Sequence, residues 1–223
     1  MPAIISITMA IGVQAMARRN AIVRHMPVIE ALGSATVICT DKTGTLTYNE
    51  LAVSDVITAD AAFTVTGVGY IPEGNVLLGG NNIVVLDHPV LNVMSQAAAL
   101  NNDATLAIEN GEWEMTGDPT EGALMSFALK AGHEQEKLAG EWRRTGVLPF
   151  SAESRYMATM HHDAEGMGVI YVKGAPEQLL AMCSEQLAHT GRETLSREYW
   201  KRQIDMLASQ GKRVLAVASK KTG

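Results

Sequence analysis

The sequence predicts an α/β fold in which a mostly antiparallel sheet is flanked by helices. Short β-branched and apolar runs alternate with turn signals, which is typical of strands. Amphipathic segments with recognisable capping residues stand between those runs, which is typical of helices. The chain has 223 residues, of which 47% are hydrophobic and 19% are charged. This composition supplies a sizeable core and is too apolar for a disordered tail, so we expect a folded globular body.

The amino-terminal segment, residues 1–17, carries almost no charge, and Arg18, Arg19 and Arg24 follow it. A complete membrane span needs about 20 apolar residues. The segment is therefore predicted to be the end of a transmembrane helix, with its arginines on the cytoplasmic side. A signal peptide would carry its charges before the apolar stretch, in the opposite order. A buried helix of a soluble core is the alternative.

A short β-branched run, Ala35–Thr40, stops at Asp41. It predicts a buried strand with a loop at its carboxyl end. The dipeptide Asn110-Gly111 favours a type I′ hairpin turn between two strands. Together with that hairpin, the strands predicted after residue 50 cover residues 63–66, 83–86, 104–109, 112–116, 145–150, 155–161, 168–173 and 213–219.

The predicted helices have recognisable capping residues. Asp118, Pro119 and Glu121 have the spacing of a capping box with proline at the first helical position, and Gly132 stands where a carboxyl-terminal glycine belongs. An apolar stripe at Val90, Val93, Met94 and Ala97 predicts a second helix. A third helix is predicted from Ser196 to Gly211.

The composition also excludes some classes of function. Eighteen Lys and Arg against 24 Asp and Glu give a net charge of −6, so no basic field attracts nucleic acid. Cys39 and Cys183 lack partners at metal-ligand spacing and are interpreted as reduced thiols. His161 and His162 are neighbours in a predicted strand and should point to opposite faces, which argues against a metal site there.

The string Asp41-Lys42-Thr43-Gly44-Thr45-Leu46-Thr47 follows the predicted buried strand. A carboxylate at the carboxyl end of such a strand lies where ligands of open α/β sheets bind. It can attack a phosphoryl group if Mg²⁺ and a neighbouring cation such as Lys42 offset its charge. Gly44 would let the backbone approach a phosphate closely. Taken as an isolated Asp-Lys pair before a glycine turn, the stretch is more typical of an ordinary solvated loop.

As a complete string, DKTGTLT resembles the phosphorylation signature of the P-type ATPases. The resemblance implies that Asp41 is phosphorylated by ATP during ion transport. It further implies that the Asp41 carboxylate and the Thr43 carbonyl are Mg²⁺ ligands.

Two further strings resemble signatures of the nucleotide-binding (N) domain in that family. Lys173-Gly174-Ala175-Pro176-Glu177 is similar to the KGAPE motif, which implies that Lys173 and Gly174 lie in the nucleotide pocket. The stretch around Thr120 and Glu121, GDPTEGA, is similar to another signature, which implies that Glu121 lies near the adenine and that Thr120 belongs to the nucleotide site. The alternatives are a solvated strand end for Lys173 and a helix cap for Glu121.

Pro149-Phe150-Ser151, followed by Arg155 and Met157, is similar to the family string that holds the base. The resemblance implies that Phe150 stacks on adenine, that Arg155 approaches the nucleotide and that Met157 lines the pocket. Arg213 matches an arginine that reaches the phosphates of ATP. Without the resemblance, Phe150 would be assigned to the core and Arg213 to a solubilising charge at a strand edge.

The resemblance implies a domain plan. Residues 1–24 form the end of a transmembrane helix and its cytoplasmic extension, and residues 25–50 form the first part of a haloacid-dehalogenase-like phosphorylation domain with its first strand. Residues 51–219 form the nucleotide-binding domain, and residues 220–223 begin the return to the phosphorylation domain.

The implied cofactors are ATP and Mg²⁺, and the implied partner is the remainder of a pump: its transmembrane helices, its actuator domain and the second half of the phosphorylation domain. The parent protein would lie in a membrane, with this portion on the cytoplasmic side. FTVTGVGY at residues 63–70 is similar to type II pumps of the calcium-pump branch. The chain alone is expected to bind ATP without transport. The alternatives are a non-catalytic nucleotide-binding module and a haloacid-dehalogenase-type phosphatase, which usually has a second aspartate where Thr43 stands.

Overall fold

The computed structural model describes residues 2–25 and 28–222. Residues 1, 26, 27 and 223, which the predicted domain ranges include, lie outside the described residues. The chain divides into two compact units, Met1–Tyr48 and Asn49–Gly223.

The described residues of the first unit form two helices, α1 (Pro2–Ala17) and α2 (Val28–Gly33). Many apolar side chains of α1 are exposed, among them Ile4, Ile7 and Ile11. Within the described part of the chain, no helix combines the length and the hydropathy that a membrane crossing requires.

The predicted buried strand Ala35–Thr40 is not formed. These residues have no regular secondary structure, and the side chains of Val37 and Ile38 are 77% and 87% exposed. A strand is held by backbone hydrogen bonds to a neighbouring strand. None of the described strands pairs with these residues, so the β-branched run has the local propensity for a strand without the ladder that would stabilise it.

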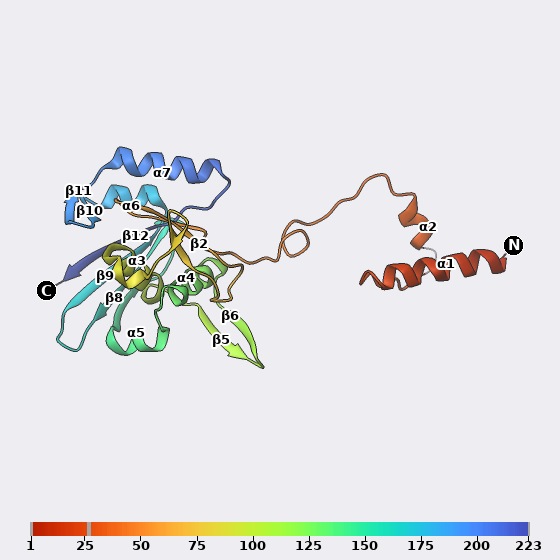
Figure 1. Cartoon of the computed structure of the whole chain (residues 1–223), viewed down its shortest axis with the longest axis horizontal. Helices are drawn as coiled ribbons and strands as arrows, with labels where there is room; N and C mark the ends of the chain where they lie inside the picture. The colour runs from red at the N-terminus through yellow and green to blue at the C-terminus, as the bar shows by residue number, and fades with distance from the viewer. Residues whose placement is uncertain (1, 26–27, 223) are drawn as a thin grey trace. The chain divides into compact units, whose positions relative to one another are not determined.

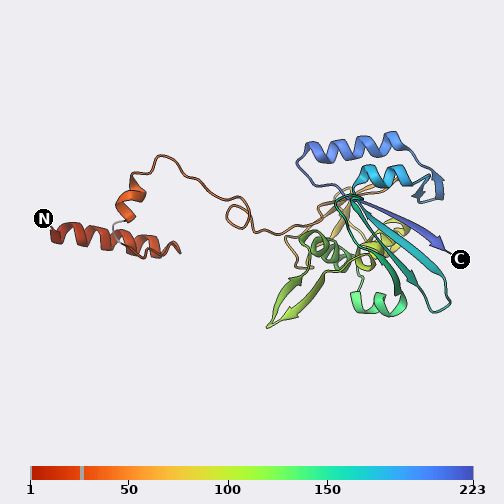
Figure 2. The ribbon, with the colours of Figure 1, turned by 180° about the vertical axis from the view of Figure 1, so that it is seen from behind.

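The second unit is built around a four-stranded antiparallel sheet, referred to here as the main sheet. Its strands are β7 (Arg143–Leu148), β8 (Tyr156–His162), β9 (Gly168–Gly174) and β12 (Ala216–Thr222). Their order is β12-β9-β8-β7. All four were predicted from the sequence to within three residues at each end. In both views the sheet lies between α5 (Gln135–Glu141) on one side and α6 (Pro176–Met182) with α7 (Arg197–Ser209) on the other (Figures 1 and 2).

A second four-stranded sheet joins β1 (Asp55–Ile57), β2 (Ala62–Val65), β3 (Val76–Leu78) and β4 (Asn81–Asn82). The prediction at 63–66 is confirmed by β2, whereas the strand predicted at 83–86 is wrong. Only Ile83 continues the ladder, by donating its N–H to the carbonyl of Val76. A 3-10 turn over Val85–Asp87 then buries Val85 and leads into the next helix. The apolar run therefore contributes a side chain to the core from a turn and not from a strand.

Two hairpins complete the strands. β5 (Thr105–Glu109) and β6 (Glu112–Thr116) pair as predicted, and Asn110 and Gly111 have φ angles of 53° and 88°, as a type I′ turn requires. β10 (Glu185–Ala188) and β11 (Gly191–Thr194) form a hairpin that the sequence analysis did not predict.

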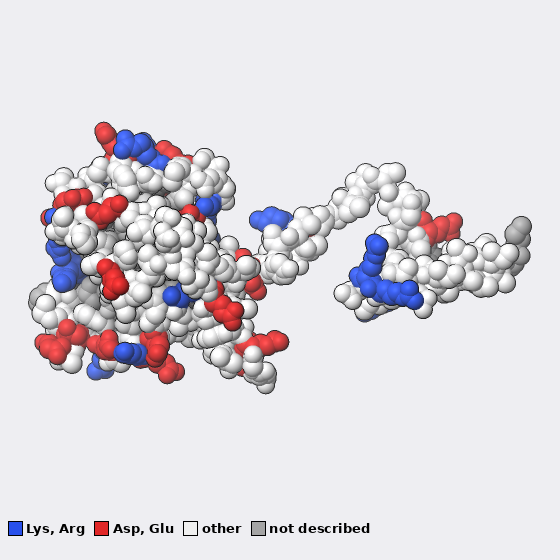
Figure 3. Space-filling model, viewed as in Figure 1, with Lys and Arg blue, Asp and Glu red and all other residues white. Residues whose placement is uncertain are grey.

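The helices α3 (Pro89–Leu100) and α4 (Pro119–Lys130) confirm two of the predicted helices and supply much of the core. Except for Ala123, the buried apolar side chains of these helices pack with Val169 and Tyr171 from β9 in one cluster. α7, the third predicted helix, turns Leu207 inward. Acidic and basic side chains are interspersed on its outer surface (Figure 3), and five of them are exposed: Arg197, Glu198, Lys201, Arg202 and Asp205.

Alternate residues of β8 and β9 face the core. His161 is buried against the Tyr171 ring, and burial lowers the pKa of this histidine. His162 lies on the opposite side of the strand and shares a hydrogen bond of 2.7 Å with the Thr145 hydroxyl. The prediction that these adjacent histidines point to opposite faces is confirmed.

Candidate functional site

The predicted nucleotide residues converge on one end of the main sheet because of its antiparallel register. Met157 on β8 pairs with Lys173 on β9, which pairs with Val217 on β12, and paired residues share a face of the sheet. Gly174 lies on the last rung of the same ladder. Three further predicted residues flank these strand ends: Phe150 after β7, Arg155 directly before β8 and Arg213 before β12. Segments that are far apart in the sequence thus meet at one end of the main sheet.

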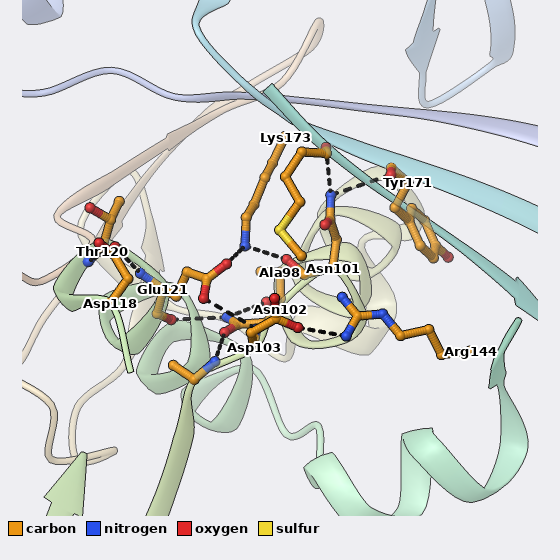
Figure 4. A network of polar contacts seen from close by, with 12 residues as sticks. Ala98, Asn101, Asn102, Asp103, Asp118, Thr120, Glu121, Arg144, Tyr171 and Lys173 are labelled. Atoms are coloured by element: carbon orange, nitrogen blue, oxygen red, sulfur yellow. Dashed lines mark hydrogen bonds and ion pairs between the residues drawn. The ribbon is translucent and has the colours of Figure 1, made fainter. Parts of the chain in front are cut away.

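Lys173 is the buried cation of this site. Its Nζ lies 2.6 Å from Glu121 Oε1 on α4 and also donates to the backbone carbonyl of Asn101 at the end of α3 (Figure 4). Only 10% of the Lys173 side chain and 14% of the Glu121 side chain are exposed. Burial lowers the pKa of Lys173, and the hydrogen bond and the charge of Glu121 oppose that shift. The alternative of a solvated strand end does not hold.

The start of α4 is capped by Asp118, whose Oδ1 accepts from the backbone N–H groups of Thr120 at 2.8 Å and Glu121 at 3.3 Å. Partial burial raises the pKa of Asp118, but these hydrogen bonds and the charge of Arg213 outweigh it, so the net pKa is lowered. The Glu121 carboxylate does not complete the predicted capping box. Its Oε2 instead accepts from the backbone N–H of Asp103, at 3.2 Å, which leaves Oε1 for Lys173.

The turn Asn101–Asp103, which the sequence analysis did not single out, organises this end of the site. The buried Asn102 side chain donates to the carbonyls of Ala98 and Glu121, at 2.9 Å each. The amide of Asn101 reaches the carbonyls of Met157 and Tyr171 on the main sheet. A run of Asn-Asn-Asp directly after an apolar helical stripe is a turn signal, and that signal was the one available in the sequence.

Arg155 and Gly174 meet where β8 begins and β9 ends. Arg155 has a φ of 59°, and its guanidinium lies 2.8 Å from Glu177 Oε1 in the first turn of α6. A Cβ atom on Gly174 would lie 2.4 Å from the Arg155 carbonyl oxygen and 2.6 Å from Tyr156 Cα. The two strands therefore approach too closely for any side chain at Gly174.

We expect Gly174→Ala to lower the free energy of unfolding by about 2 kcal/mol, because the added methyl group overpacks against backbone that cannot move aside. Gly146→Ala is the matched control in the same sheet, since its Cβ would lie 3.4 Å from Met160 Cβ. Urea unfolding of both variants measures the difference. Equal stability of the two variants would contradict the close approach.

The remaining predicted residues differ in exposure. Phe150 is 62% exposed and is not part of the core. Met157 is buried beneath the strand end. Arg213 is exposed, precedes β12, and acts on Asp118 through its charge.

Asp41, Lys42 and Thr43 belong to the first unit, and all three are exposed. The Lys42 carbonyl accepts from the backbone N–H groups of Leu46 at 3.0 Å and Thr47 at 3.2 Å. Gly44 takes a φ of 75° in this turn. Among the residues that the structure describes, no cluster of three or more His, Cys, Asp or Glu could hold a metal ion. The oxygens of Asp41 and Thr43 are of the kind that Mg²⁺ prefers.

The chain is similar to known proteins over almost its whole length. A family model described as P-type ATPase, cytoplasmic domain N, matches residues 91–223, more than half of the chain. The chain is 43% identical over 99% of its length to the cation-transporting ATPase pma1 of a Synechocystis strain. It is 35% identical to a calcium-transporting ATPase of Bacillus subtilis and 36% identical to the human calcium-transporting ATPase type 2C member 1, each over 98% of its length.

The chain spans about a quarter of the length of these curated relatives, with 25%, 25% and 24% of them covered. The family match and the near-complete coverage of the chain together carry the assignment. The chain belongs to the P-type cation ATPase family, and residues 91–223 are its cytoplasmic N-domain region.

Proposed function

We propose that residues 49–222 bind ATP at the end of the main sheet, and that in the parent pump Asp41 accepts the γ-phosphoryl group. The observation that carries the nucleotide site is the convergence of an exposed aromatic ring, Phe150, with Lys173 and Arg155 at the same strand ends. An exposed ring is a platform for a purine, and an exposed arginine beside it suits the phosphates.

The charges at this site support a polyphosphate ligand. Arg155 and Arg213 lie on exposed segments, where they can turn toward a phosphate chain. Lys173 is held more rigidly, by Glu121 and by the Asn101 carbonyl. We assign Lys173, Glu121 and Thr120 to the base end of the nucleotide and the two arginines to its phosphates. Gly174 keeps the backbone close-packed beneath them.

In the proposed phosphorylation step, a carboxylate oxygen of Asp41 forms a bond to the γ-phosphorus of ATP. The bond between that phosphorus and the bridging oxygen breaks, and ADP leaves with the electron pair. Lys42 offsets negative charge beside Asp41. When bound, Mg²⁺ would be held by the Asp41 carboxylate and the Thr43 carbonyl and would offset the charge of the phosphates.

The relatives named above are cation-transporting and calcium-transporting ATPases. We therefore propose that the parent protein couples the aspartyl-phosphate to cation transport across a membrane, with this portion on the cytoplasmic side. The remaining pump domains are its proposed partners. The family match favours this function over a haloacid-dehalogenase-type phosphatase.

The nucleotide site is tested by Phe150→Ala. We expect this variant to bind ATP about tenfold or more weakly, because a stacked base contributes about 1–3 kcal/mol in nucleic-acid proteins. The thermal unfolding midpoint should stay unchanged, because the ring is largely exposed. Titration calorimetry with ATP on the 223-residue chain provides the measurement.

Ile108→Ala is the matched control, since Ile108 is also 62% exposed but lies near the turn of the β5–β6 hairpin. It should bind ATP as the wild type does. Identical, weak heats from the wild type and from Phe150→Ala would reject the proposed site.

A further inference from the structure

One ion pair at the proposed nucleotide site joins Arg155, a proposed phosphate ligand, to Glu177, which has no role in the proposed function. Arg155 Nη1 lies 2.8 Å from Glu177 Oε1, and 47% and 59% of the two side chains are exposed. The Ala175 N–H donates to the Arg155 carbonyl at 2.9 Å, so the segments before β8 and after β9 are tied together beneath the pair. The pair is therefore held at the strand ends by the backbone.

The backbone of Arg155 adds a second observation. Its φ of 59° is in the left-handed region, which is uncommon for a residue other than glycine. The Arg155 N–H donates to the Ser151 carbonyl at 2.8 Å, and the Ser154 N–H donates to the Ser151 hydroxyl at 3.1 Å. This closed turn after Phe150 fixes the point from which the Arg155 side chain leaves the sheet, within reach of Glu177.

The two ion pairs at the proposed site affect how it can bind a polyphosphate. Lys173 is neutralised by Glu121 and Arg155 by Glu177, so both cations are matched by carboxylates before any ligand arrives. An exposed ion pair contributes little, because water and salt screen it. A polyphosphate can therefore displace Glu177 at small cost, whereas Glu121 is held in a buried pair.

We propose that Glu177 is a positioning residue that acts as a latch: it holds Arg155 when no nucleotide is bound and competes with the nucleotide phosphates for that arginine. The proposal deepens the proposed function and depends on it. The latch makes affinity depend on the number of phosphates, because a more highly charged ligand competes better with one carboxylate. Adenosine, which has no phosphate, does not engage it.

The latch is tested by Glu177→Gln in the 223-residue chain. We expect about threefold tighter binding of MgATP at low ionic strength, a smaller gain for AMP and no change for adenosine. The gain should shrink in about 0.5 M salt, because the Debye length falls there to about 4 Å and exposed charges are screened much more strongly than at low ionic strength. Titration calorimetry of the three ligands gives the dissociation constants.

Two further variants separate the latch from a general charge effect. Glu185→Gln removes another exposed, ion-paired glutamate, on the β10–β11 hairpin, and should leave all three affinities unchanged. In Arg155→Gln, the further change Glu177→Gln should have no effect, because the cation that the latch holds is absent.

Tighter MgATP binding in Glu177→Gln that disappears in the Arg155→Gln background supports the latch. Unchanged binding, an equal gain for adenosine, or the same gain with and without Arg155 overturns it. If the wild type binds MgATP and Glu177→Gln binds it with the same affinity, the latch alone is overturned. Wild-type protein that binds no MgATP would overturn the proposed function, and the latch with it.

Discussion

Lys173→Met is expected to lower the free energy of unfolding by about 3 kcal/mol, because it leaves the Glu121 carboxylate buried without its cation. The two side chains are only 10% and 14% exposed. The substitution also leaves the Asn101 carbonyl without its donor. Urea unfolding measures the loss as a lower midpoint with an unchanged denaturant slope.

The double variant Lys173→Met with Glu121→Gln should recover a large part of that stability. Glutamine carries no charge, and its amide oxygen can still accept the hydrogen bond that the Asp103 N–H donates to Glu121 Oε2. Arg144→Met is the matched control: Arg144 lies 2.6 Å from Asp103, as close as Lys173 to Glu121, but these side chains are 33% and 54% exposed. We expect a loss of at most about 1 kcal/mol there. Equal losses from Lys173→Met and Arg144→Met would contradict the buried pair.

Asp41→Asn is expected to abolish the phosphoenzyme of the parent pump entirely. An amide has no anionic oxygen to attack the γ-phosphorus, so the covalent step of the proposed mechanism cannot begin. Asp41 is exposed in the first unit, so the substitution should leave folding unchanged. The measurement is the radiolabel from the γ-phosphate of ATP that stays on acid-precipitated protein.

Glu30→Gln is the control for that substitution, because Glu30 is the other acidic residue of the first 48 and is also exposed. It should keep the phosphoenzyme. ATP binding to the 223-residue chain should be the same in the wild type and in Asp41→Asn, since the proposed nucleotide site lies in residues 49–222. Label retained on the Asp41→Asn protein would refute the proposed acceptor.

The fold was predictable wherever neighbouring residues determine it. The Asn110-Gly111 turn fixes the β5–β6 hairpin, and Asp118 with Pro119 fixes the start of α4. Each element carries its own turn or capping chemistry, and that chemistry is local in the sequence. The same local signals failed at 35–40 and 83–86, where a β-branched or apolar run did not become a strand because strand pairing depends on what lies beside it.

At the candidate site, too, the local sequence predicted some features, and others depended on contacts between distant residues. The sequence motifs named Lys173, Glu121 and Phe150, but each also had an ordinary structural alternative. The structure rejects a solvated strand end for Lys173, because this side chain is buried against Glu121. It also rejects a core position for Phe150, because this side chain is largely exposed. Glu177 lay inside a quoted motif without a role, and no periodicity indicated that it would meet Arg155.

The sequence by itself determined the family motifs, the strands of the main sheet and the capped helices, because these depend on residue type and on spacing along the chain. The tertiary structure alone decided which charges are paired and which are buried. The register of four antiparallel strands brings Arg155 to Glu177 and places Lys173 opposite α4. Contacts between residues so far apart in the sequence are set by backbone hydrogen bonds across the sheet, which no local pattern of residues encodes.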